Sequence, residues 1–138
     1  MISNILLDIN ILLNFFLKRR DFDVAEKVLI LAKDNEVKAF VGISILQTTS
    51  FYLQKSYGSK ISKELLLELL LIVNIIEADE EIVLQALNSS IADIEDAVHF
   101  YTATKHKLDY ILSSDIAFQK LSNKNLQITS AEKFLALF

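Results

Sequence analysis

The chain has 138 residues, of which 52% are hydrophobic and 23% charged, and its mean hydropathy is +0.37. This length suits one domain over residues 1–138, and the apolar content is far too high for a disordered chain. The absence of cysteine excludes disulfide scaffolds, thiolate metal sites and cysteine nucleophiles, and it fits the reducing cytoplasm. The net charge of −4 gives no overall basic field, so any contact with nucleic acid must be local.

No segment resembles a targeting or membrane sequence. The apolar opening of the chain is interrupted by Asp8 and by asparagines, and it lacks the basic start of a signal peptide. The most apolar stretch, residues 65–76, contains Glu68 and is much shorter than the about 20 apolar residues that a membrane span needs. We therefore expect no membrane contact.

Short apolar runs alternate with helical repeats along the chain. The runs predict four buried strands and a weaker fifth, at residues 4–9, 38–41, 73–77, 109–112 and 127–128. The repeats predict a first helix beginning near Asn10 and further helices over residues 21–33, 44–55, 62–71, 80–87, 93–106, 116–121 and 130–138. This alternation predicts an α/β fold, a three-layer α/β/α sandwich around a parallel sheet of about five strands.

Several kinds of catalytic site are excluded by composition. With only two glycines, Gly42 and Gly58, the chain cannot form the glycine-rich loops that bind nucleotide phosphates. The two histidines, His99 and His106, lie seven residues apart, whereas helical metal pairs favour a spacing of four. We therefore predict no zinc pair or catalytic triad, and we interpret His99 as a packed or solvent-facing residue.

Carboxylates follow two of the predicted strands at their carboxyl ends. Asp8 ends the first strand, and Asp115 follows the fourth strand after two serines. In parallel sheets ligands bind beyond the carboxyl ends of the strands, so both acids are candidate site residues. Each is also well placed to cap the helix that follows it, and the two roles are compatible.

A third group of acids opens the helix before the fourth strand. The spacing of Asp93 and Asp96 places both on one side of that helix, with Glu95 toward solvent. Three carboxylates in four residues exceed what capping requires. Carboxylates are the ligands that Mg²⁺ and Mn²⁺ prefer, and such ions assist phosphodiester hydrolysis.

Three segments resemble motifs of the PIN-domain family, small metal-dependent ribonucleases that include the toxins of VapBC-type toxin–antitoxin pairs. Residues 6–13, LLDINILL, resemble the opening LLDTNVLL, residues 93–98, DIEDAV, resemble DFEDAL, and residues 111–115, ILSSD, resemble the family's last acidic motif. The resemblance implies that Asp8, Asp96 and Asp115 are the catalytic, metal-binding acids. It also implies that Asn10 and Ser113 support them.

Two positions depart from the family pattern. Many members carry a glutamate where this chain has Ser50, and a hydroxyl residue where it has Ile9. Losing one acid lowers the negative charge available to a cation, so binding should be weaker and favour Mn²⁺ or bound substrate phosphate. Ser50 is then a supporting residue, and Asp93 or Glu95 could supply the missing ligand.

The leading hypothesis is a Mg²⁺- or Mn²⁺-dependent endoribonuclease that acts as a toxin, with the basic run Lys18, Arg19 and Arg20 contacting the RNA backbone. The alternative is a degenerate PIN fold that binds RNA or protein without cutting. A phosphorylated receiver domain fits poorly, because it needs an acidic pair at the first strand and a lysine after the last, whereas Lys133 falls within a predicted helix.

The early helices carry more apolar residues than one core face needs, which are Phe15, Phe16, Leu17, Phe51, Tyr52 and Leu53. They fit a well-filled core and an interface equally well. The family resemblance favours a homodimer and a small antitoxin protein as partners.

Overall fold

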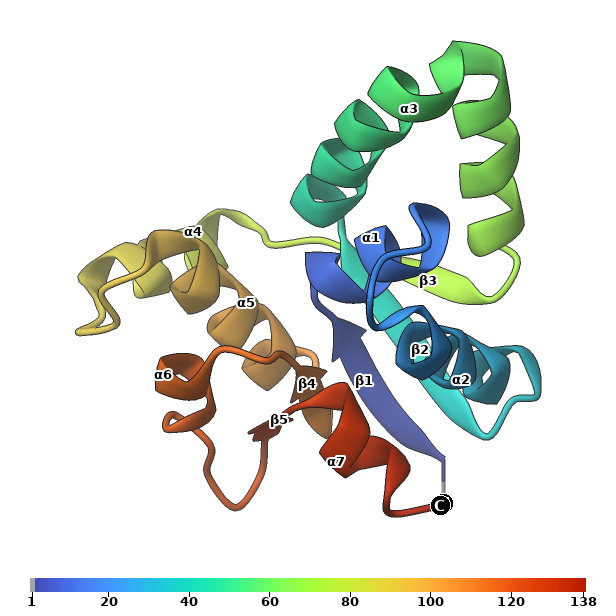
Figure 1. Ribbon diagram of the computed structural model, residues 1–138. Coiled ribbons are helices and arrows are strands. Elements are labelled where there is room, and N and C mark those ends of the chain that lie inside the picture. The colour runs from blue at the N-terminus through green and yellow to red at the C-terminus, as the bar shows by residue number, and fades with distance from the viewer. Residues whose placement is uncertain (1) are drawn as a thin grey trace.

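The computed structural model describes residues 2–138, which form a five-stranded parallel sheet of strand order β3-β2-β1-β4-β5 (Figure 1). The strands are β1 (Ser3–Leu7), β2 (Val37–Gly42), β3 (Val73–Ile76), β4 (Tyr110–Leu112) and β5 (Gln127–Thr129). The helices are α1 (Ile9–Phe16), α2 (Phe22–Lys33), α3 (Ile43–Leu69), α4 (Glu80–Asn88), α5 (Ile94–Lys105), α6 (Ile116–Gln119) and α7 (Ala131–Leu135). The predicted α/β fold is confirmed.

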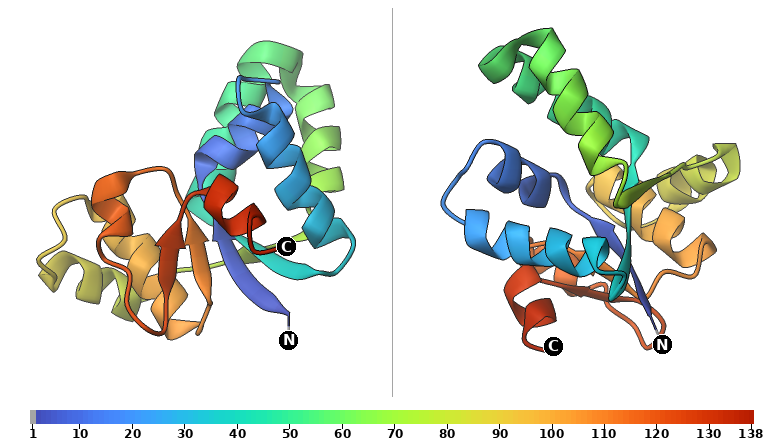
Figure 2. Two further views of the ribbon diagram at one scale, coloured as in Figure 1. Left: turned by 60° about the horizontal axis from the view of Figure 1, so that its bottom comes forward. Right: turned by 90° about the vertical axis from the view of Figure 1, so that its right-hand side faces the viewer.

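Helices cover both faces of the sheet, as the right-hand view of Figure 2 shows. Side chains alternate along β1, where Ile5 and Leu7 belong to one core and Leu6 to the other. The first core includes residues of α1, α2, α3 and α7, and the second includes residues of α5 and α6. Because β1 is buried on both faces, its apolar run is continuous rather than alternating.

One strand boundary was predicted wrongly at a position that matters for the site. The apolar pattern predicts β1 as far as Ile9, but Ile9 begins α1. The reason is that Asp8 Oδ1 accepts a hydrogen bond from the Ile9 N–H at 2.7 Å, so the helix starts directly after the strand. Asp8 is therefore the single residue between the end of β1 and the start of α1.

The predicted pair of helices between β2 and β3 forms the two arms of α3, on either side of a kink (Figure 1). Gly58 interrupts it with φ 79° and ψ 170°, a conformation that glycine adopts without a side-chain clash. Tyr57 beside the kink donates a hydrogen bond to the Phe16 carbonyl at 2.7 Å, which ties α3 to the end of α1. Neither α3 nor any other helix in residues 2–138 is long and apolar enough to cross a membrane.

The carboxyl ends of the five strands share one edge of the sheet. The central strand β1 pairs with β2 on one side and β4 on the other, with Leu7 opposite Leu112. The chain leaves β1 toward β2 and later returns to form β4, so the strand order changes direction at β1. Ligands of open parallel sheets bind in the crevice at such a point.

Candidate active site

Three of the predicted site acids cap helices at the carboxyl edge. Asp8 Oδ1 caps α1, and Asp115 Oδ1 accepts from Ala117 N at 2.9 Å and Phe118 N at 3.2 Å at the start of α6. Asp93 Oδ1 accepts from the N–H of Asp96 at 2.9 Å at the start of α5. The capping interpretation is thus confirmed, and capping leaves the Oδ2 atoms of these acids without a hydrogen-bond partner in residues 2–138.

Asp96 differs from these three acids because its side chain caps nothing. It is half-buried in the first turn of α5, and burial is the main cause that raises its pKa to about 6. The negative charges of Asp93, Asp115, Asp8 and Glu95 raise the pKa further. The structure therefore brings the other four predicted carboxylates within electrostatic reach of Asp96, including Glu95, whose side chain is exposed.

Asp8 lies within electrostatic reach of Glu95 and Asp115. Burial raises its pKa, the Ile9 N–H and His99 act to lower it, and the charges of Glu95 and Asp115 raise it again. A carboxylate in this position is stabilised by any cation that enters the site.

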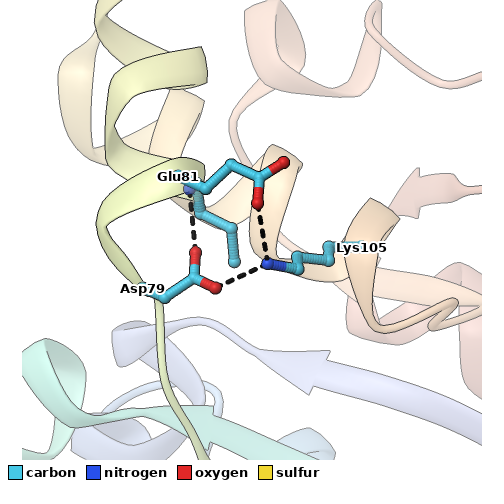
Figure 3. Close-up of polar contacts among 4 residues, drawn as sticks. Asp79, Glu81 and Lys105 are labelled. Carbon is cyan, nitrogen blue, oxygen red and sulfur yellow. Dashed lines mark hydrogen bonds and ion pairs between the residues drawn. The ribbon is translucent and has the colours of Figure 1, made fainter.

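No lysine or arginine neutralises these carboxylates in the part of the chain that the structure describes. The ion pairs of residues 2–138 join Lys105 to Asp79 and Glu81 at the other end of α5 (Figure 3). The acids at the carboxyl edge thus form a cluster of uncompensated negative charge, which favours a bound cation.

The donor type of the cluster fits a hard divalent ion such as Mg²⁺ or Mn²⁺. Within residues 2–138, however, no three aspartate, glutamate or histidine side chains converge on one point at which they would hold an ion. Asp8 precedes α1, Asp96 lies in α5 and Asp115 precedes α6, so the three acids reach this edge from three different elements.

The supporting residues have different positions. Ser113 is buried, and its Oγ accepts from the Asp115 N–H at 3.2 Å, while its carbonyl accepts from Gln119 Nε2 at 2.8 Å. These bonds fix the loop that carries Asp115, and Gln119 is a contributor that the sequence did not reveal. Ser50 instead donates to the Gln47 carbonyl on α3 at 2.6 Å, a local bond that joins no site acid.

The basic run lies in the exposed loop after α1. Asp8 precedes the first residue of α1, and Lys18, Arg19 and Arg20 follow the last, so about 12 Å of helix separates them. None of the three pairs with a site acid among the described residues. The run is thus a neighbour of the site and not a part of it.

A pocket of about 60 Å³ opens beside Asp8. Its lining is rich in polar side chains, of which sequence analysis identified Asp8, Asn10 and Ser113 and missed Ser114 and four residues of other elements: Asn14, Asp21, Ser130 and Glu132. These four come from α1 and from the starts of α2 and α7, so only the fold could bring them together.

His99 was interpreted as a packed or solvent-facing residue, and the structure places it against the site. Its Nε2 is buried and has no hydrogen-bond partner in residues 2–138. Burial lowers its pKa, whereas Glu95, Asp8 and Asp93 raise it. The four-residue spacing from Glu95 to His99 was the sequence signal that could have identified it.

The sequence matches the family model described as PIN domain over residues 4–117. The chain belongs to the PIN-domain family. The matched range contains β1, α5, β4 and the start of α6, and so includes every acid of the cluster. No curated protein matches the chain.

Solved structures similar to this PIN domain confirm the fold. VapC20 of Mycobacterium tuberculosis, described as a Sarcin-Ricin loop cleaving toxin, has a TM-score of 0.64 and 14% identity, with 89% of this chain and 98% of that chain covered. VapBC2 from Rickettsia felis, bound to a DNA fragment from its promoter, has a TM-score of 0.65 and 17% identity, with 91% of this chain and 98% of that chain covered. A toxin–antitoxin complex from Klebsiella pneumoniae has a TM-score of 0.65 and 18% identity, with 88% of this chain and 93% of that chain covered.

Proposed function

We propose that this PIN domain is a divalent-metal-dependent endoribonuclease that acts as the toxin of a toxin–antitoxin pair. The observation that carries the proposal is the cluster of uncompensated carboxylates at the point where the strand order changes direction. Membership of the PIN family and the similarity to VapC20, a toxin that cleaves the Sarcin-Ricin loop, support this chemistry.

In this proposal Asp8, Asp96 and Asp115 hold Mg²⁺ or Mn²⁺. A bound divalent ion supplies Lewis-acid polarisation of the RNA phosphate and lowers the pKa of an attacking water. Asp8 and Asp115 offer their free Oδ2 atoms, while their capping Oδ1 atoms keep each side chain in place. Ser113 and Gln119 orient the loop of Asp115 through the hydrogen bonds described above.

The surroundings of the cluster suit a bound RNA strand. Besides the acids Asp21 and Glu132, the pocket beside Asp8 is lined by uncharged polar groups of Asn10, Asn14 and Ser114, which can hydrogen-bond a base or sugar next to the cleaved bond. Lys18, Arg19 and Arg20 at the far end of α1 supply positive charge for a phosphate farther along the strand.

A homodimer and an antitoxin partner belong to the same proposal. Phe51 and Tyr52 on α3 are 57% and 39% exposed and pack edge to face at 5.5 Å, which leaves an aromatic surface open to a partner. Phe16 and Leu53 of the same sequence group are buried, so only part of that group belongs to the core. The toxin–antitoxin complex among the similar structures supports an antitoxin as partner.

The test is cleavage of a pool of unrelated RNA fragments by pure protein with Mn²⁺. We expect cleavage by the unaltered chain and a loss of at least about a hundredfold in Asp8→Asn and Asp96→Asn, because a bound metal contributes several kcal/mol. Glu81→Gln, which alters an acid of the ion-paired cluster, is the matched control and should keep full activity. Equal cleavage by all four proteins would reject the mechanism.

A second candidate is a PIN fold that binds RNA or protein without cutting. The observation that favours it is that no three potential ligands converge within residues 2–138, together with Ser50 in place of a further acid. It predicts saturable RNA binding by the unaltered protein, measured by gel shift, with no cleavage at any Mn²⁺ concentration.

A further inference from the structure

The most unusual polar group of the site is the imidazole of His99. Its Nε2 is buried and unpartnered within residues 2–138, and buried nitrogen atoms nearly always have a hydrogen bond, a water or an ion. The other histidine, His106, is exposed at the end of α5. An explanation is therefore needed for His99 alone.

The nitrogen faces the carboxyl end of β2. A methyl group added to Gly42 would lie 3.9 Å from His99 Nε2 and 3.9 Å from Ser44 Oγ, which is ordinary contact distance. Strands β1 and β2 are parallel, and Leu6 pairs with Phe40. Asp8 and Gly42 each follow this pair by two residues, so both lie at the carboxyl edge of the sheet. His99 Nε2 thus borders a small space at the same edge as the acids.

Two carboxylates are close to this imidazole. Glu95 lies one helical turn before His99 on α5, so the two side chains share one side of the helix. The charges of Glu95 and Asp8 both act on His99, and His99 in turn acts on Asp8.

We propose that His99 Nε2 is a nitrogen ligand of a divalent ion that Asp8 and Glu95 also bind. The inference rests on the proposed function, because it requires a cation in the acid cluster. Glu95 is exposed, and because no three such side chains converge on one point in residues 2–138, its carboxylate has to rotate toward the ion. The charge of Asp8 also acts on Asp96, which links His99 to the acid cluster of the proposed function.

A nitrogen ligand changes the metal preference of the site. Imidazole binds transition-metal ions better than it binds Mg²⁺, which prefers oxygen. We therefore expect this chain to prefer Mn²⁺ to Mg²⁺. In calorimetric titrations, His99→Gln should lower the Mn²⁺ affinity by about tenfold or more and lower the Mg²⁺ affinity less.

The direct test is pulsed electron paramagnetic resonance of Mn²⁺ bound to the full chain, which detects a directly coordinated nitrogen. Since the chain has two histidines, the signal can be assigned with two variants. We expect a nitrogen coupling that disappears in His99→Gln and persists in the matched control His106→Gln. Gly42→Ala should weaken the nitrogen coupling, because the added methyl occupies the space beside Nε2. The variant should fold, because the extended backbone of Gly42, with φ −71° and ψ 151°, accepts alanine.

Three outcomes would overturn the inference. Bound Mn²⁺ with no nitrogen coupling would mean that a water between Nε2 and Ser44 satisfies His99, and the proposed nuclease would be unaffected. A coupling lost in His106→Gln would assign the ligand to the wrong histidine. Failure of Mn²⁺ to bind the unaltered chain would overturn both this inference and the metal-dependent function.

Discussion

A group of acids lies at each end of helix α5, one on the first turn of α5 and one at the start of α4, and only the second group has a basic partner in residues 2–138. At its C-terminal end, Lys105 Nζ lies 2.5 Å from Asp79 Oδ2 and 3.6 Å from Glu81 (Figure 3), and this partner lowers the pKa of Asp79. At its N-terminal end, Asp96 has no basic partner in residues 2–138 and its pKa is raised to about 6.

The difference shows which acids the fold itself uses. Lysine neutralises the exposed acids between α4 and α5, so their charge is satisfied without a ligand. At the carboxyl edge, capping bonds hold three acids in place, but the added charge of Asp96 remains uncompensated. Such a group lowers the free energy of unfolding and is typical of a site that binds a cation.

The largest expected difference between the two groups is in stabilisation by metal. Mn²⁺ at about 100 times its Kd should raise the free energy of unfolding by about 2.7 kcal/mol, because only the folded chain has the site. Asp8→Asn should abolish this increase and Glu81→Gln should keep it. Urea unfolding with and without Mn²⁺ measures the effect, and an equal increase in Asp8→Asn would place the ion elsewhere.

The next effect is the pH dependence of metal binding. Asp96 must lose its proton to bind a cation, and its pKa in the metal-free protein is about 6. The Mn²⁺ affinity should therefore fall about tenfold between pH 7 and pH 5, which corresponds to about 1.4 kcal/mol. Calorimetry at several pH values measures this fall, and a flat profile down to pH 5 would contradict the role of Asp96.

A smaller effect is expected for Asp96→Asn without metal. Because the folded-state pKa of about 6 exceeds the ordinary value of 3.8, the folded protein binds the proton more tightly, and stability falls as pH rises through this window. Removing the charge should then stabilise the protein at pH 7 by about 1 kcal/mol, since solvent screens a half-buried group. Urea unfolding should show no gain at pH 3.5, and a destabilised variant at pH 7 would contradict the account.

The smallest effect is expected at the ion-paired end of α5. Lys105→Gln breaks an exposed pair with Asp79, and exposed pairs contribute little to stability because solvent and salt screen them. The urea midpoint should change little, and the Mn²⁺ affinity should stay the same. A clear loss of Mn²⁺ affinity in this variant would show that the two acid groups are coupled.

Much of the fold could be predicted because parallel strands need continuous apolar runs. All five predicted strands form, and Gly58 separates the two arms of the predicted helix pair as a kink in α3. The end of β1 at Leu7 could not be predicted, because Ile9 is as apolar as the strand before it and only the capping bond from Asp8 makes it helical.

The acids were predictable because strand ends and capping positions can be read from local sequence. The spacing from Glu95 could have placed His99 on the same side of α5 as that acid, but its position near Gly42 depends on β2 lying beside β1, which local spacing does not reveal. The same is true of Asp21 and Glu132, which reach the pocket beside Asp8 from α2 and α7. Residues that depend on long-range packing are thus the ones that sequence analysis missed.

The measurement that tests the central claim most directly is calorimetric titration of Mn²⁺ into the unaltered chain, Asp96→Asn and Glu81→Gln at pH 7.5. We predict saturable binding by the unaltered chain and by Glu81→Gln, and a large loss of affinity in Asp96→Asn. No binding at millimolar Mn²⁺, or equal binding by all three proteins, would contradict a cation site in the uncompensated acid cluster.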